Sequence, residues 1–215
     1  MINHHPDEAL LLDYATGALS EAVALTIATH ASMCIRCMRQ INQLEAIGGS
    51  LLASETPAEC DDGVLAQILM RLDDEGLEPA ATVKTESSAI LPPPLRPYVN
   101  EPLHQLPWKR VGGLYEEYRL PLADTKVRAS LFRLAAGTHT PKHSHRGQEL
   151  VLVLSGGYRD GDAQFARGDF SALDVADTHQ PIVDDDGPCL CLGVQEAPMR
   201  LTEVLSLRLR RFLRI

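Results

Sequence analysis

The chain has 215 residues, 45% of them hydrophobic, which is enough to bury a core larger than that of one small domain. Residues 1–97 hold 5 Lys and Arg against 14 Asp and Glu, whereas residues 98–215 hold 15 of each, so the net charge of −9 lies in the first half. Because phosphate contacts need a basic face, we do not expect this half to bind nucleic acid directly. A basic protein partner fits it better, and solubility alone is the plain alternative.

No stretch is long and apolar enough to span a bilayer, and the acidic first twenty residues show no secretory signal, so we expect a cytoplasmic protein. Four of the five cysteines form two close pairs, Cys34 with Cys37 and Cys189 with Cys191. This spacing predicts metal or redox chemistry in a reducing compartment and not a disulfide framework. Cys60 stands apart and is interpreted as a bystander, although it could substitute as a metal ligand.

Apolar residues recur with helical spacing in four segments, which predict helices over residues 7–17, 20–30, 34–52 and 61–72. On a helix, His30, Cys34 and Cys37 are spaced i, i+4 and i+7 and point from one face. Two thiols and an imidazole on one stripe suit a tetrahedral zinc ion, whose fourth ligand could be His4 or His5. The alternative is a free cysteine pair beside a surface histidine.

Residues 77–97 are rich in proline and small polar residues, a composition typical of a semi-extended spacer. We therefore predict a domain boundary here, with a helical unit over residues 1–76 and a second unit over residues 98–215. In the second unit the pattern becomes strand-like, with strands expected over 127–134 and 149–155 and glycine-rich turns after them. Short strands with such turns predict a barrel or a double-sheet jelly roll. The tail over residues 205–213 fits both strand and helix periods.

A second group of metal-ligating residues lies in this β-rich half. His143, His145 and Glu149 share parity, so on extended backbone they face one way, and His179 is the candidate to join them from another strand. Imidazoles and a carboxylate converging inside a barrel predict a divalent-metal site. The alternative is a barrel whose core histidines are satisfied without metal, and His104 and His139 are given no role.

Cys189 and Cys191 are two residues apart on an expected strand, so their thiols face the same way. That separation is near the upper limit for an unstrained disulfide. The pair is either oxidation-sensitive or metal-linked, or it is simply two buried apolar side chains.

The pattern Gly137-x5-His143-x-His145-x3-Glu149-x6-Gly156 resembles the first cupin motif at every fixed position. The second motif is incomplete: Gly168-Asp169 and His179 are present, but Asp174 and Ala176 replace the usual Pro and Gly. With the helical His30, Cys34 and Cys37 stretch and the Pro-rich segment, the full chain resembles the ChrR-type zinc-binding anti-sigma factors.

This resemblance implies an α+β multidomain protein in which a four-helix zinc-binding domain is followed by an all-β cupin barrel. It implies zinc on His5, His30, Cys34 and Cys37, and zinc or another divalent metal (Mn, Fe or Ni) on His143, His145, Glu149 and His179. The helical domain would bind an extracytoplasmic-function (ECF) sigma factor and block its access to core RNA polymerase and promoter. The barrel would release it under singlet-oxygen or peroxide stress. Neither direct nucleic-acid binding nor membrane association is implied, and a homodimer is left open.

The rival hypothesis is a metal-dependent cupin enzyme of the dioxygenase or isomerase class, with the helical zinc domain as an accessory. A cupin fold alone cannot decide, because it carries both enzymes and non-enzymes. A third hypothesis is a metal-responsive cupin module with another helical partner. The helical zinc domain favours the anti-sigma reading, because a small-molecule enzyme has no need of it.

Overall fold

The computed structural model describes residues 1–59, 61, 63–72, 90–124, 126–196 and 200–201. Cys60, most of the predicted spacer and the ambiguous tail over 205–213 lie outside the described residues. The four predicted helices are present as α1 (Glu8–Ala15), α2 (Glu21–Met33), α3 (Ile35–Ser54) and α4 (Val64–Leu72). Asp7 starts α1 by accepting a hydrogen bond from the Leu10 amide at 2.8 Å, an N-cap that satisfies one of the free amides of the first turn.

The predicted helix stripe is interrupted at Cys34. This residue has extended φ and ψ angles of −115° and 101°, so α2 ends and α3 begins there. His30 therefore lies in the last turn of α2 and Cys37 in the first turn of α3. The separate helices predicted over 20–30 and 34–52 are therefore present, but the single helical face assumed for His30, Cys34 and Cys37 is not. The bend at Cys34, and not helical periodicity, sets the relative directions of the three side chains.

The second half is a β-barrel of two facing layers, as predicted. A six-stranded antiparallel sheet has the order β1-β2-β3-β11-β5-β8, and two three-stranded sheets have the orders β10-β6-β7 and β12-β4-β9. The strands are β1 (Lys109–Val111), β2 (Tyr115–Arg119), β3 (Arg128–Leu134), β4 (His143–Ser144), β5 (Glu149–Ser155), β6 (Gly157–Asp160), β7 (Ala163–Ala166), β8 (Phe170–Leu173), β9 (Thr178–His179), β10 (Ile182–Val183), β11 (Cys189–Gln195) and β12 (Arg200–Leu201). This confirms the all-β class expected for the C-terminal part.

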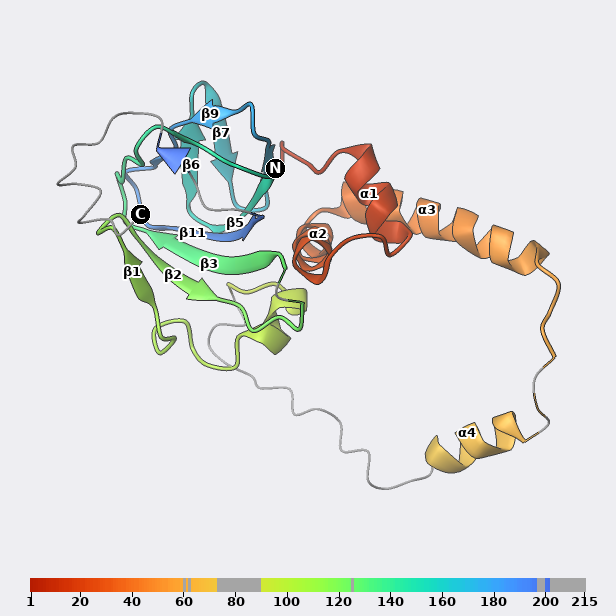
Figure 1. The fold of residues 1–215 in the computed structure, drawn as a ribbon. Helices are drawn as coiled ribbons and strands as arrows, with labels where there is room; N and C mark the ends of the chain where they lie inside the picture. The colour runs from red at the N-terminus through yellow and green to blue at the C-terminus, as the bar shows by residue number, and fades with distance from the viewer. Residues whose placement is uncertain (60, 62, 73–89, 125, 197–199, 202–215) are drawn as a thin grey trace.

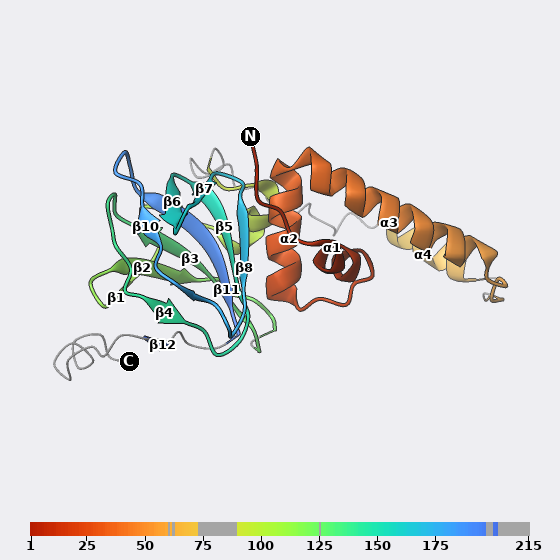
Figure 2. The ribbon, with the colours of Figure 1, turned by 90° about the horizontal axis from the view of Figure 1, so that it is seen from above.

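Strand β5 is covered on both faces because α2 packs on the outside of the six-stranded sheet. Leu150, Leu152 and Leu154 are buried in one hydrophobic cluster with residues of α2, whereas Glu149 and Val151 face the barrel interior. Figure 2 shows α2 lying against the sheet, with α1 and α3 on its far side. The helical and β parts therefore share a continuous core, as expected when amphipathic elements bury their apolar faces against each other.

The end of the predicted spacer is packed structure. Residues Pro93–Tyr98 form a 3-10 helix, η2, which packs against α2, and Leu91, Leu95 and Val99 are buried. Tyr98 donates a hydrogen bond to Glu21 at the start of α2. Prolines fix the φ angles of this backbone, and the apolar side chains of Leu91, Leu95 and Val99 reach the core. The part of the spacer over residues 90–97 is thus a strap between the two halves.

The second half of α3 projects away from the body, and α4 lies apart from it (Figure 1). Their large apolar side chains are exposed to solvent, namely Ile47, Leu51, Leu52, Val64, Leu65, Ile68, Leu69, Met70 and Leu72. Groups of large exposed apolar side chains such as these mark an interaction surface more often than chance exposure. No helix among the described residues has the length and apolarity needed to cross a membrane.

Candidate metal centres

The helical part brings four nitrogen and sulfur donors together. The Nδ1 atom of His5 lies 3.4 Å from the Sγ atoms of both Cys34 and Cys37, and Nε2 of His30 lies 3.3 Å from Sγ of Cys37. All four donor atoms fall within 4.8 Å of one another. Tetrahedral zinc would place nitrogen and sulfur ligands about 3.5 Å apart. The donor set and its spacing therefore fit a structural zinc site.

The structure distinguishes the two N-terminal histidines that the sequence left as alternatives. His5 points to the cysteines, whereas the ring of His4 stacks on Phe165 at 4.3 Å and donates through Nε2 to the carbonyl oxygen of Gln164. His4 is thus a docking residue for the N-terminal segment. His5 alone of the two belongs to the donor group.

Burial shifts the pKa values of the donors in this helical-domain site. His30 is fully buried, and this burial lowers its pKa to about 4, so its imidazole is neutral and its free ring nitrogen is available to a metal at neutral pH. Burial and the adjacent Cys34 raise the pKa of Cys37 to about 12. A bound dication reverses this preference by stabilising the thiolate, so metal binding would release protons.

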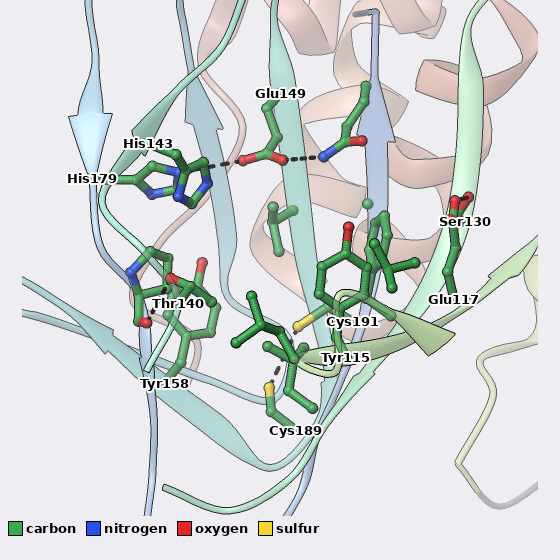
Figure 3. Close-up of a pocket in the computed structure, with 18 of the residues that line it drawn as sticks. Tyr115, Glu117, Ser130, Thr140, His143, Glu149, Tyr158, His179, Cys189 and Cys191 are labelled. Carbon is green, nitrogen blue, oxygen red and sulfur yellow. Dashed lines mark hydrogen bonds and ion pairs between the residues drawn. The ribbon is translucent and has the colours of Figure 1, made fainter. Parts of the chain in front are cut away.

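The barrel brings together the second predicted group. His143 lies on β4, Glu149 on β5 and His179 on β9, where His179 is paired in register with His143 (Figure 3). His145 follows β4. Nε2 of His145 lies 3.0 Å from Nε2 of His179 and 3.1 Å from Oε2 of Glu149. Three imidazoles and a carboxylate converge here with their ligand atoms within 4.8 Å. This borderline donor set fits a divalent transition-metal ion such as Zn, Mn, Fe or Ni.

Residues that the sequence analysis did not single out orient these ligands. His143 donates through Nδ1 to the Pro141 carbonyl at 2.7 Å, and His179 donates through Nδ1 to Oδ2 of Asp160 at 2.8 Å. Each bond leaves Nε2 free to bind metal, the usual arrangement around ligating histidines. Asp160 ends β6. Its position opposite His179 comes from the pairing of β6 with β10 and was invisible in the sequence.

Glu149 is held in its ionised form. Burial by itself would raise its pKa, but contacts with His145, a hydrogen bond from Gln195 Nε2 at 2.7 Å and the nearby His179 bring the pKa below its ordinary value. His145 is oriented differently, because its buried Nδ1 has no hydrogen-bond partner among the described residues. Only packing and the ligand group itself therefore fix the direction of the His145 ring.

Three of these ligands, His143, Glu149 and His179, line a barrel cavity of about 390 Å³. Its walls are largely apolar, and the paired thiols of Cys189 and Cys191 line the same space, with their Sγ atoms 3.4 Å apart (Figure 3). The neighbouring Cys189 and burial raise the pKa of Cys191 well above its ordinary value, so the Cys191 side chain is a thiol. Neither His104 nor His139 joins a donor group within the described part of the chain.

A β-barrel whose His and Glu side chains gather beside an interior cavity is of the cupin type, here joined to a helical module with zinc-type donors. A family model described as the ChrR cupin-like domain matches residues 101–198. Anti-sigma-E factor ChrR of Cereibacter sphaeroides is 36% identical over 214 residues, covering 100% of this chain and 99% of the relative. The crystal structure of Rhodobacter sphaeroides SigE in complex with the anti-sigma ChrR matches with a TM-score of 0.78 and 34% identity, covering 91% of this chain and 100% of that chain. The chain belongs to the ChrR family of anti-sigma factors.

Proposed function

We propose that this anti-sigma factor binds and inhibits an ECF sigma factor through its helical part, with residues 1–76 as the inhibitory unit. The carrying observation is the row of exposed apolar side chains on α3 and α4 in a chain similar over its full length to ChrR, whose solved complex contains SigE. The acidic first half adds electrostatic steering toward a basic, DNA-binding partner. Sigma factors act on RNA polymerase, so the proposed partner supports a cytoplasmic location.

In this proposal His5, His30, Cys34 and Cys37 hold a structural zinc ion. A helical unit of this size, with few aromatic residues, gains folding free energy from such a staple. His143, His145, Glu149 and His179 hold zinc or another divalent metal in the barrel. The barrel acts as a regulatory module and not as a catalyst, in keeping with a family of anti-sigma factors.

The barrel is further proposed to sense oxidative stress, from singlet oxygen or a peroxide, and to weaken the complex when its site is altered. The support is the placement of metal ligands and two thiols around one cavity. A peroxide could take two electrons from the thiol pair, whose protons leave with the reduced oxidant as a disulfide forms. Loss of a ligand or of the metal would act in the same direction. Tenfold easier release of the partner requires about 1.4 kcal/mol of coupling free energy.

The partner surface can be tested by co-purification of the tagged full chain from its native cells, with mass spectrometry of what is bound. Wild type should retain an ECF sigma factor, and Leu51→Asp with Leu65→Asp should lose most of it, because a charge in an apolar contact is costly. Val175, an exposed apolar residue of the barrel, provides the matched control as Val175→Asp. Equal recovery of the sigma factor with the α3 and α4 variant would refute this surface.

A further inference from the structure

The N-terminal segment that carries His5 is bound to the barrel. Oδ1 of the buried Asp169 accepts the backbone amides of Asn3 at 2.6 Å and His4 at 2.9 Å. The Phe170 amide returns a hydrogen bond to the His4 carbonyl at 3.1 Å. His5 is the next residue, so its approach to Cys34 and Cys37 is set by a backbone clamped on the turn between β7 and β8.

The same turn contacts a second donor of the helical site. Nδ1 of His30 donates to the carbonyl oxygen of Gly168 at 2.9 Å. Because a carbonyl oxygen only accepts, the hydrogen is on Nδ1 and the lone pair is on Nε2, the atom that faces Cys37. A barrel residue therefore selects both the tautomer and the ring orientation of a ligand in another part of the chain.

Glycine is favoured at this contact for two reasons. Gly168 has a φ of +93°, a conformation that L side chains rarely adopt. A Cβ atom on Gly168 would also lie 2.6 Å from Cδ1 of Ile2, which packs where that atom would be. The Gly168-Asp169 pair, noticed in the sequence only as a remnant of a cupin motif, is thus shaped to receive the N-terminal segment.

We infer that the Gly168-Asp169 turn of the barrel positions His5 and His30 and thereby sets the metal affinity of the helical-domain site, an inference that rests on the metal site proposed above. Two of the four donors are oriented by the barrel, whereas Cys34 and Cys37 are oriented by the helices. Thermodynamic linkage makes the effect reciprocal, so metal in the helical site also stabilises docking of the N-terminal segment on the barrel.

The turn also lies in the chain segment that serves the barrel site. Strand β6 ends at Asp160, which holds His179, and pairs with β7, whose end leads directly into Gly168 and Asp169. The β6–β7 hairpin therefore carries two orienting carboxylates. Asp160, at its tip, serves the barrel site, and Asp169, just after β7, serves the helical site. A displacement of this hairpin would reach both donor groups.

Cobalt substitution in the full chain tests the inference. Thiolate ligands give Co²⁺ a charge-transfer absorption in the near ultraviolet that nitrogen and carboxylate ligands do not give, and its loss in Cys34→Ala with Cys37→Ala would assign the band to the helical site. Competition with a chelator then gives the Co²⁺ affinity. We expect Asp169→Ala to weaken it by about 10- to 100-fold. Asp169→Asn, which keeps an acceptor for Asn3 and His4, should recover much of the affinity.

Asp162, exposed at the tip of the same hairpin, provides the matched control as Asp162→Ala and should leave the affinity unchanged. If Asp169→Ala does not fold, Ile2→Ala decides, because it loosens the segment by removing only a partly buried side chain at the edge of the core. A severalfold loss of Co²⁺ affinity is expected. If Asp169→Ala folds and keeps the wild-type Co²⁺ affinity, the inference is overturned while the metal site stands. If Asp169→Ala does not fold, wild-type Co²⁺ affinity in Ile2→Ala overturns the inference in the same way. Absence of the thiolate band from wild type would instead overturn the metal site itself and the inference with it.

Discussion

The two donor groups differ in what holds their ligands. In the barrel, the orienting partners Pro141, Asp160 and Gln195 belong to the barrel itself, as the ligands do. In the helical part, the orienting partners Gly168 and Asp169 belong to the barrel. The barrel group is therefore a local property of one fold, whereas the helical group depends on how two parts of the chain dock. A regulator that must respond to a change in one part benefits from that dependence.

Removing the thiols of the helical site should have the largest effect. Cys34→Ala with Cys37→Ala should abolish metal binding there and destabilise the helical part by several kcal/mol, because structural zinc sites contribute about 10 kcal/mol or more. Metal content per chain and thermal unfolding of the full chain measure it. Cys189→Ala with Cys191→Ala should keep this metal. Unchanged metal content and melting temperature in the first variant would exclude a structural zinc site.

Weakening the packing of the strap should lower the stability that the two parts share. Leu95 is fully buried between η2 and α2, so Leu95→Ala should lower the free energy of unfolding by about 2–5 kcal/mol. Leu52→Ala, at a site that is 75% exposed, should change it by less than about 0.5 kcal/mol. Denaturant melts of the full chain provide both values. Equal stability of the two variants would show that the halves fold without using their shared core.

Changing a barrel ligand should leave the helical site alone. Glu149→Gln and His179→Ala should each lower the barrel's metal affinity by more than about 100-fold, the upper range for merely orienting residues. Under the proposed sensor function, repression in resting cells persists while the response to singlet oxygen or peroxide is blunted. A transcriptional reporter measures both. A normal rise after stress in both variants would remove the barrel site from the sensing role.

The smallest effect is expected at the residue that orients His179. Asp160→Ala should weaken barrel metal binding by about tenfold, about 1.4 kcal/mol, because the imidazole loses the partner that fixes its tautomer. The thiolate–cobalt affinity of the helical site should be unchanged if this end of the hairpin acts locally. A matching loss at the helical site would show instead that the two donor groups are coupled through β6 and β7.

The sequence by itself predicted the helices, the longer strands and both donor groups to a large extent. Apolar periodicity is a local property, and His30, Cys34 and Cys37 or His143, His145 and Glu149 are close in sequence, so short-range spacing predicts their proximity. The resemblance to the ChrR family was visible in the same motifs and is confirmed. Charge asymmetry indicated a basic partner, which stays a prediction.

Only the tertiary structure decided which distant residues complete and orient these groups. In the structure His5 and not His4 faces the cysteines, the extended backbone of Cys34 sets the directions of the helical-site donors, Asp160 contacts His179, and η2 packs into the core. Each of these depends on pairing or packing between residues far apart in the chain, which no local pattern encodes. The docking of the N-terminal segment on Gly168 and Asp169 is the clearest case. Its hydrogen bonds join Asn3 and His4 to Asp169, across sequence separations of 166 and 165 residues. These bonds exist only after both halves have folded together.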